Sequence, residues 1–327
     1  MRALTISRPG GPEVLEVRTA ADPVIGPEEV LVRVRASALN RADILQRRGL
    51  YPAPPGVAPD VPGLEFSGEV EASGALVTAL QPGDRVMGLV GGGGQAEKVR
   101  VHERLCLRIP PGMSFEDAAA VPEAFLTAYD ALFERARLHA GEPVLVHAAG
   151  SGVGTAAASM AAVAGARVVA LSRSPDKRRR LAALGAHHVL DPAAANVAEA
   201  IRRAAGGDGI RVVLDLVGAS VWALNVEVLA TLGRIVLVGT MSGRKVEADL
   251  SALMRKRATV VGTVLRSRPI EEKIELVQRF SRTMLPLLAA GRLSPVVHRV
   301  FPLEEAAGAH AAMERNENFG KIVLRIS

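Results

Sequence analysis

The sequence predicts an α/β protein in which a doubly wound parallel sheet is combined with an irregular β-rich domain. One observation is that β-branched runs alternate with Ala-, Leu- and Arg-rich segments between residues 142 and 264. A second is that short alternating segments, broken by Gly and Pro, fill the first 120 residues. A chain of 327 residues with 49% hydrophobic and 23% charged residues is long and apolar enough for two such cores.

The first region contains strand patterns such as residues 29–35 and 66–71, in which apolar and polar side chains alternate. Residues 115–137 then show helical segments that break at Pro122. In the middle of the chain, strand and helix patterns alternate, which predicts right-handed βαβ units and a parallel sheet. The expected strands of that sheet are residues 144–146, 167–171, 188–190, 212–216, 235–238 and 259–264.

The last region predicts a long amphipathic helix over 270–290, a short helix near 304–313 and a final strand over 321–326. It shares no repeat with the middle of the chain, and it can complete the β-rich domain. We therefore expect one domain from residues 1–122 and 266–327, and a second from residues 123–265.

Charge and cysteine content narrow the classes of function. The net charge is +6, but there are only 7 Phe, 1 Trp and 2 Tyr, so a nucleic-acid stacking surface is not expected. Cys106 is the only cysteine, which excludes internal disulfides and Cys-rich zinc clusters and favours the cytoplasm.

The longest uncharged stretch, residues 143–166, is interrupted by His147 and four glycines, so it predicts a strand, a turn and a helix rather than a membrane span.

A glycine-rich segment follows the first strand of the α/β region. It departs from G-x-G-x-x-G, because Ala149 and Ser151 stand at the first two glycine positions when Gly154 is the third. The turn is still small, and the amides that open the next helix would face a pyrophosphate. We therefore predict dinucleotide binding here, with a purely structural turn as the alternative; the residues are Gly150, Ser151, Gly152, Val153, Gly154 and Thr155.

The end of the second strand of this region favours NADPH over NADH. NAD-preferring proteins usually place Asp or Glu there to bind the ribose 2′-hydroxyl. This chain has Ser172 and Arg173 at that place, with Lys177 a turn later, and these side chains suit a 2′-phosphate. Two alternatives remain: Arg173 and Lys177 are only the solvated start of a helix, or Asp176 permits NADH.

The order of several motifs resembles the medium-chain dehydrogenase/reductase superfamily, and more narrowly its zinc-free quinone oxidoreductases of the zeta-crystallin type. The motifs are residues 36–43, 62–70, 82–86, 122–124, 151–155, 265–268 and 318–323. The resemblance covers essentially the whole chain and implies a Rossmann domain beside a GroES-like domain. Zinc-dependent members have a cysteine where Asn40 stands and a histidine where Leu64 stands. Leucine is not a zinc ligand, so we expect no metal.

The resemblance implies reduction of quinones, ortho-quinones among them, by NADPH, and it leaves open semiquinone products. Without a Lewis acid, an acceptor that delocalises negative charge is the easier substrate. Asn40 and Asp43 would hydrogen-bond the acceptor or order a water, and Tyr51 would stack on the acceptor or donate a proton. Alternatively, Asp43 pairs with Arg41 or Arg47, and Tyr51 is a packing aromatic.

Further cofactor contacts are implied by the resemblance or by strand ends. Thr127, Leu265 and Asn318 match positions near the nicotinamide, and Gly239 ends a later strand where backbone can approach the cofactor. Each could instead be a packing or turn residue. The chain departs from the family at Asp191–Pro192, where a tyrosine commonly lies near the adenosine end.

Two rival functions and one assembly are also open. The chain could be an NADPH-dependent reductase of α,β-unsaturated carbonyls, or a non-enzymatic NADPH- or RNA-binding protein. The resemblance implies a homodimer through the sheet edge at residues 257–263, whose apolar run would be exposed in a monomer. We expect a small-molecule quinone and a second copy of the chain as partners, and neither nucleic acid nor a membrane.

Overall fold

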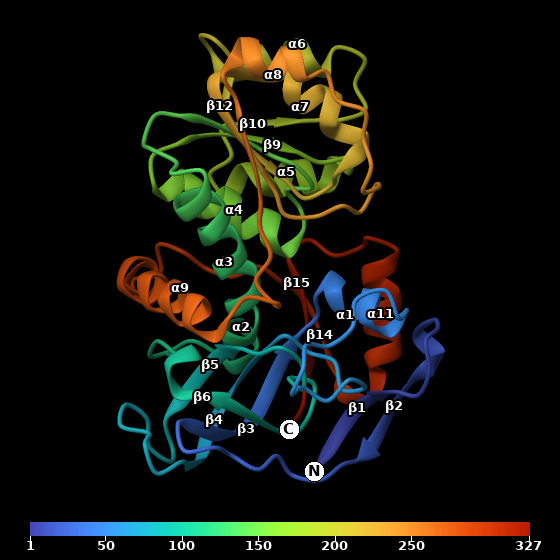
Figure 1. Ribbon diagram of the computed structural model, residues 1–327, viewed down its shortest axis with the longest axis vertical. Helices are drawn as coiled ribbons and strands as arrows, with labels where there is room; N and C mark the ends of the chain where they lie inside the picture. Colours follow the sequence, from blue (N-terminus) through green and yellow to red (C-terminus); the bar gives the residue numbers. More distant parts are fainter. The chain divides into compact units, whose positions relative to one another are not determined.

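The polypeptide forms two units, and the chain returns to the first after completing the second. The computed structural model describes all residues from 1 to 327. Unit 1 comprises residues 1–126 and 265–327, and unit 2 comprises residues 127–264. Figure 1 shows that each unit has its own sheet and helices.

Unit 2 is built on a six-stranded, wholly parallel sheet in the order β10-β9-β8-β11-β12-β13. The chain starts in the middle of the sheet, runs to one edge and then to the other, which is the predicted doubly wound topology. The α/β fold with a separate β-rich domain is therefore confirmed. The elements are η3 (Asp130–Arg135), β8 (Pro143–Val146), α4 (Gly152–Val163), β9 (Arg167–Leu171), α5 (Pro175–Ala183), β10 (His188–Leu190), α6 (Val197–Ala205), β11 (Ile210–Asp215), η4 (Ala219–Val221), α7 (Trp222–Val228), β12 (Leu229–Leu237), α8 (Leu250–Lys256) and β13 (Thr259–Gly262).

The apolar content of these strands explains the sheet. Leu145, Val169 and Val213 are completely buried in one cluster with apolar residues of α6. Strands covered on both faces need continuous apolar runs rather than alternation, which is the pattern found in the sequence. Residues 143–166 form β8, a turn and α4. No helix in the structure combines the length and the apolar character needed to cross a membrane.

Unit 1 contains a seven-stranded sheet with the path β14-β15-β3-β4-β5-β7, and β6 also pairs with β3. A separate ribbon pairs β1 with β2. In Figure 1 the carboxyl-terminal strand β15 lies among the strands of the amino-terminal region. The elements are β1 (Arg2–Ile6), η1 (Pro12–Val14), β2 (Leu15–Thr19), β3 (Glu29–Ala38), α1 (Arg41–Arg47), β4 (Glu65–Ser73), β5 (Arg85–Leu89), β6 (Lys98–His102), η2 (Glu103–Leu105), β7 (Cys106–Arg108), α2 (Phe115–Ala119), α9 (Ile270–Thr283), α10 (Leu285–Ala289), β14 (Val297–Pro302), η5 (Leu303–Glu305), α11 (Ala306–Glu314) and β15 (Lys321–Arg325). Helix α3 (Pro122–Tyr129) includes the boundary between the two units.

Three predicted elements differ from the structure in ways that change the fold description. The expected helix over 270–290 is two helices, because Pro286 lacks the N–H that a continuous helix needs and instead stands in the first turn of α10. The strand expected at 235–238 begins at Leu229 and ends at Leu237, and the one expected to reach residue 264 ends at Gly262.

Candidate active site

The loop between β8 and α4 is shaped by close contact between backbone atoms. A Cβ atom at Gly154 would lie 2.5 Å from the carbonyl oxygen of Ala148 and 2.7 Å from the Cα of Ala149. Ser151 caps the helix, because its hydroxyl accepts a hydrogen bond from the Gly154 N–H at 3.1 Å. Glycine at 154 is therefore required for the loop and the helix to pack together.

The first turn of α4 supplies backbone donors for an anion. Gly152 and Val153 begin this twelve-residue helix, so their N–H groups have no acceptor within it. The Thr155 hydroxyl donates to the Gly152 carbonyl at 3.0 Å, and Gly150 is buried in the preceding turn. The loop and the helix dipole suit the pyrophosphate of a dinucleotide. The residues of this segment thus fit a nicotinamide cofactor.

Positive charge gathers where β9 ends. Ser172 is buried, Arg173 is exposed and Lys177 is half-buried in the first turn of α5. Burial lowers the pKa of Lys177, and the positive charges of Arg173 and Arg180 lower it further, so an anion bound nearby would relieve the repulsion. The carboxylate of Asp176, the residue that kept NADH open, forms an ion pair with Arg179 at 3.0 Å.

Arg178 fixes the backbone at this place, a role that the sequence did not reveal. Its guanidinium donates to the carbonyl oxygens of Ser172 and Arg173 and to the carboxylate of Asp191, each at 2.9 Å. Asp191 thus holds Arg178 through an ion pair, within the Asp191–Pro192 segment where the chain departs from the expected family pattern.

A buried polar chain supports the strand ends of unit 2. Asp215 accepts hydrogen bonds from the N–H groups of Val217 and Gly218, both at 2.8 Å, and from the Asn225 amide at 2.9 Å. Because the Asn225 amide nitrogen donates to Asp215, its oxygen accepts, and His147 Nε2 donates to it at 2.6 Å. Burial lowers the pKa of His147, so the ring is neutral.

Gly239 and Thr127 also lie in unit 2. A Cβ atom at Gly239 would lie 2.8 Å from the carbonyl oxygen of Leu216, so this glycine permits a close approach of two strand ends. Thr127 is buried in α3. Leu265 and Asn318, the other residues assigned to the cofactor, belong to unit 1. Leu265 is buried, and the Asn318 amide donates to the carbonyl oxygen of Gly320 at 2.7 Å in the turn before β15.

Strand register brings three polar side chains of unit 1 together. Antiparallel pairing of Val323 with Ala38 places Lys321 opposite Asn40, and the pairing of β3 with β4 places Glu65 beside them. The Lys321 ammonium donates to Asn40 Oδ1 at 2.7 Å and to the Leu39 carbonyl at 2.8 Å, and it lies 2.7 Å from Glu65 Oε1. The Asn40 amide donates to the same Glu65 oxygen at 2.8 Å.

Asp43 lies at the first turn of α1, next to Asn40. Its carboxylate accepts the N–H of Asn40 at 2.7 Å and the N–H of Gly63 at 3.0 Å. Burial raises the pKa of Asp43 to about 6, and the two N–H donors limit that rise. The alternative pairing was wrong: Arg41 donates to Asn316, and Arg47 pairs with Glu314.

Arg266 organises the loop that carries Tyr51. Its guanidinium lies 5.1 Å from the centre of the Tyr51 ring and donates to the Tyr51 carbonyl at 3.3 Å. It also donates to the Gln46 side chain at 2.6 Å and to the Gly91 carbonyl at 2.7 Å. Burial raises the pKa of Tyr51, so its hydroxyl keeps its proton at neutral pH. The ring is thus a fixed, half-buried aromatic surface.

Glu123 completes the cluster in unit 1. Its N–H donates to Glu65 Oε2 at 2.8 Å at the start of α3. Burial, followed by the nearby charge of Glu65, raises the pKa of the Glu123 carboxyl to about 8. Four residues of this cluster were not predicted from the sequence: Glu65, Glu123, Arg266 and Lys321. A signal was present in Leu64-Glu65-Phe66 and at the start of the last strand, because a charge inside an apolar segment requires a partner.

The structure contains no group of three or more His, Cys, Asp or Glu side chains arranged to hold a metal ion. Near Asn40 the positive charge is that of Lys321, bound by three oxygen atoms. Beside the aromatic surface of Tyr51, a polar acceptor could take a hydrogen bond from Asn40 by replacing the long 3.3 Å bond from its amide to the Ala38 carbonyl.

Comparisons with known proteins agree on both units. The family model described as Zinc-binding dehydrogenase matches residues 152–282, and the one described as Alcohol dehydrogenase GroES-like domain matches residues 26–111. A quinone oxidoreductase from Pseudomonas aeruginosa is 35% identical over 320 residues, covering 96% of each protein. The phthioceranic/hydroxyphthioceranic acid synthase of Mycobacterium tuberculosis is 36% identical over 330 residues, 99% of this chain, but this chain spans only 15% of the synthase.

Solved structures match over the whole chain. An NAD-dependent alcohol dehydrogenase has a TM-score of 0.90 and 34% identity, with all of both chains covered. The mycobacterial protein Rv1454c, complexed with NADPH, has a TM-score of 0.90 and 28% identity, again with all of both chains covered. The CurK enoyl reductase has a TM-score of 0.88 and 29% identity over 100% of this chain and 99% of that one.

Proposed function

Because the chain belongs to the quinone oxidoreductases of the medium-chain dehydrogenase/reductase superfamily, we propose that it reduces a quinone with NADPH and without a metal ion. Family membership makes the chain an oxidoreductase; the cofactor, the acceptor and the metal-free reaction are the proposal. The observation that carries it is the Lys321 ammonium, which binds Asn40, Glu65 and Leu39. A fixed cation already neutralises the polar cluster at the position where zinc-dependent relatives have a ligand.

A metal-free site favours an acceptor that needs little electrostatic help. When a simple aldehyde is reduced, negative charge develops on one oxygen and needs strong stabilisation. A quinone spreads this charge over a conjugated ring, so the protein needs mainly to hold the ring and exclude water. Asn40 would hydrogen-bond the acceptor and Tyr51 would stack on it, while Asp43 would maintain the turn that presents Asn40.

Unit 2 would act as the dinucleotide-binding domain. Bound NADPH would supply the hydride. The loop from Gly150 to Thr155 would bind the pyrophosphate, and Ser172, Arg173 and Lys177 would bind the 2′-phosphate. Gly239 would let the backbone approach the cofactor, and Thr127, Leu265 and Asn318 would lie near the nicotinamide.

The cofactor proposal is tested by removing the two cations together. We expect the double variant Arg173→Ala, Lys177→Ala to bind NADPH about 10- to 100-fold more weakly, because charge-assisted contacts to a phosphate are lost. NADH binding should change less than threefold. Isothermal calorimetry with each cofactor measures both, with Arg179→Ala on the same helix as the control. Equal losses for NADPH and NADH would contradict a 2′-phosphate site.

The acceptor is tested by the rate of NADPH oxidation with an ortho-quinone and with an enone, in protein treated with a chelator. Faster turnover of the quinone supports the proposal. The similarity to CurK enoyl reductase favours a second candidate, reduction of an α,β-unsaturated carbonyl, and faster turnover of the enone would support it. Binding of NADPH or RNA without any turnover would instead favour the non-enzymatic alternative.

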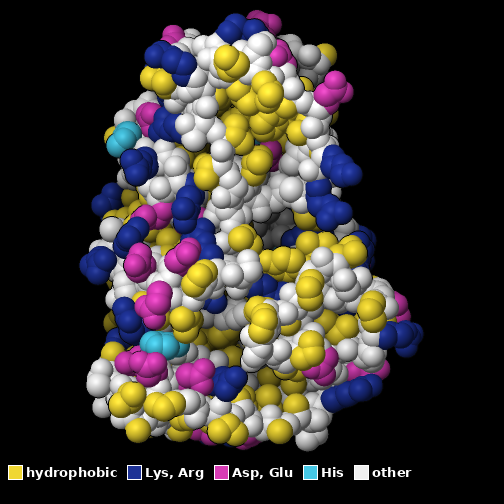
Figure 2. Space-filling view, in the orientation of Figure 1, with side chains coloured by type: hydrophobic (Ala, Val, Ile, Leu, Met, Phe, Trp, Pro, Cys, Tyr) yellow, Lys and Arg dark blue, Asp and Glu magenta, His cyan; other side chains and the backbone are white.

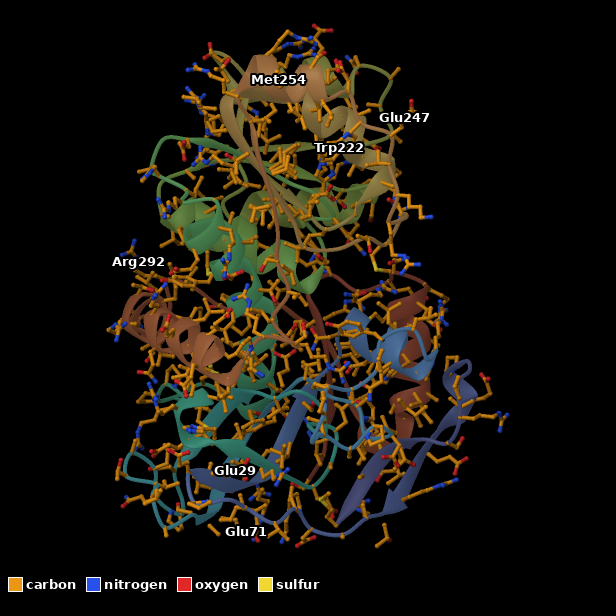
Figure 3. The ribbon with its side chains drawn as sticks, in the orientation of Figure 1. Glu29, Glu71, Trp222, Glu247, Met254 and Arg292 are labelled. Atoms are coloured by element: carbon orange, nitrogen blue, oxygen red, sulfur yellow. The ribbon has the colours of Figure 1, made fainter.

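We also propose a cytoplasmic homodimer that forms through the edge of the unit 2 sheet. Strand β13 pairs only with β12, and Val260 is 39% exposed on it. Figure 2 shows hydrophobic side chains over α7 and α8, and Figure 3 marks Met254 on α8, where it is 76% exposed. An exposed apolar edge favours pairing with a second copy. Light scattering should give twice the chain mass, and Val260→Lys should give the monomer.

A further inference from the structure

We propose that the carboxyl group of Glu123 gives its proton to the acceptor when the acceptor is reduced. This inference rests on the proposed function and adds a catalytic residue to it. Glu123 is half-buried at the start of α3, and its N–H donates to Glu65 at 2.8 Å. It therefore lies in the cluster that also contains Asn40 and Tyr51.

Neither Lys321 nor Arg266 forms a hydrogen bond with the Glu123 carboxyl. The Lys321 ammonium has three N–H groups, and its three oxygen partners are Leu39, Asn40 and Glu65. The Arg266 guanidinium donates to Gly91, Tyr51 and Gln46. The Glu123 carboxyl forms no ion pair, although it lies among other carboxylates.

Charged and titratable groups face Glu123 from every element around it. They are Glu65 on β4, Lys321 on β15, Asp43 on α1, Lys273 on α9, and Arg266 and Tyr51 on loops. Glu65 is neutralised by Lys321, and Asp43 is held by two N–H donors. Glu123 is the carboxyl left without such stabilisation, so it is the one that keeps a proton at neutral pH, in agreement with its raised pKa of about 8.

The other candidates for the proton donor are less suitable. The pKa of Asp43 is about 6, so this side chain is ionised at pH 7 and has no proton to give. Tyr51 holds its proton, but burial raises its pKa above the ordinary value, which makes it a weak acid. A general acid works best when its pKa is near the working pH.

The step balances with one hydride and one proton. The acceptor takes two electrons with the hydride from NADPH, and the O–H bond of Glu123 breaks while an O–H bond forms on the quinone oxygen. Glu123 remains as a carboxylate, held near Lys273 and Arg266, and it takes up a proton from water after the product leaves. The hydrogen nucleus of the transferred hydride becomes the hydrogen of the product's second hydroxyl group.

The protonation of Glu123 is measured first, in the protein without cofactor. Glutamate labelled with 13C at the carboxyl carbon is incorporated, and the carboxyl resonances are followed from pH 4 to pH 10. We expect one resonance to titrate near pH 8 in the wild type and to be missing in Glu123→Gln. The control variant Glu116→Gln, which removes a charge from α2, should keep this resonance. If Glu123→Gln still shows the resonance that titrates near pH 8, the inference is overturned.

The catalytic role is measured with the active full-length protein and the preferred acceptor. We expect Glu123→Gln to lower kcat about 100-fold at pH 7, with the KM for NADPH within twofold, because general acids contribute at this scale. The wild-type kcat should fall tenfold per pH unit above about pH 8, and the variant should lose this fall. Tyr51→Phe should keep it. Wild-type kcat and pH dependence in Glu123→Gln, or loss of the fall in Tyr51→Phe alone, would overturn the inference.

These results separate the inference from the function on which it rests. If the wild type oxidises NADPH with neither a quinone nor an enone, the proposed function fails and the inference fails with it. If the wild type is active and Glu123→Gln is equally active, only the inference fails.

Discussion

Two fully buried carboxylates, Glu65 in unit 1 and Asp215 in unit 2, are stabilised in different ways. Glu65 lies against the Lys321 ammonium, whereas Asp215 is held by three amide N–H groups and no cation. The three N–H groups around Asp215 bind only that carboxylate. From there the hydrogen bonds continue through Asn225 and end at the neutral His147. The lysine carries a full charge, and Asp43 and Glu123 lie near it. A buried cation thus supports an acidic cluster that can hold a proton, while buried amides only fix a shape.

The largest expected effect comes from removing the cation of this comparison. Lys321→Met leaves Glu65 buried without its counter-charge, and breaking a buried pair in this way costs about 3–5 kcal/mol. Urea unfolding at pH 7 should show this loss in the free energy of unfolding. Adding Glu65→Gln should recover part of it, because the uncompensated charge is gone. A loss below about 1 kcal/mol in the single variant would contradict the role of Lys321.

A smaller effect is expected at Asp215. Asp215→Asn keeps the size of the side chain but turns one acceptor into a donor. The new amide can satisfy the N–H groups of Val217 and Gly218 or the amide of Asn225, but not both. An unsatisfied buried donor costs about 1–3 kcal/mol. Calorimetric unfolding should show this loss, and adding Asn225→Asp should restore part of it by reversing the second partner. A loss as large as that of Lys321→Met would show that the charge of Asp215 matters as much as its geometry.

The effect that is smallest over one pH unit is the pH dependence of stability, which has opposite sign in the two clusters. Folding raises the pKa of Glu123 from its ordinary 4.5 to about 8, so its contribution to stability falls as pH rises between these values. Folding lowers the pKa of His147, so stability is lost as pH falls below 6.5. One proton accounts for at most about 1.4 kcal/mol per pH unit.

The two variants separate these effects. The free energy of unfolding of Glu123→Gln should rise relative to that of the wild type as pH increases from 6 to 8. That of His147→Gln should rise relative to the wild type as pH decreases from 6 to 5. His310 in unit 1, whose pKa is lowered to about 3, affects both proteins equally and cancels in the difference. Urea unfolding at each pH measures both, and a difference that does not change with pH would contradict the assigned protonation states.

Much of unit 2 could be predicted from the sequence because its signals are local. The strand at 167–171 was predicted with its observed bounds, since a buried parallel strand is a continuous apolar run. Gly154 was recognisable because close packing of the loop against the helix places a demand on that single residue, whereas the cap at Ser151 was seen only in the structure. Where one local signal competes with another, as at Pro286 in the expected helix over 270–290, the prediction failed.

The sequence alone determined the α/β class, the glycine-rich loop and the family resemblance, because each depends on patterns within short segments. Only the tertiary structure decided that Lys321, Asn40, Glu65 and Glu123 form one cluster. Lys321 and Asn40 are 281 residues apart, and they meet through the antiparallel register of β15 on β3. The proton that we assign to Glu123 depends on this meeting, because the charge state of a buried carboxyl is set by the groups around it in space and not by its neighbours in the chain.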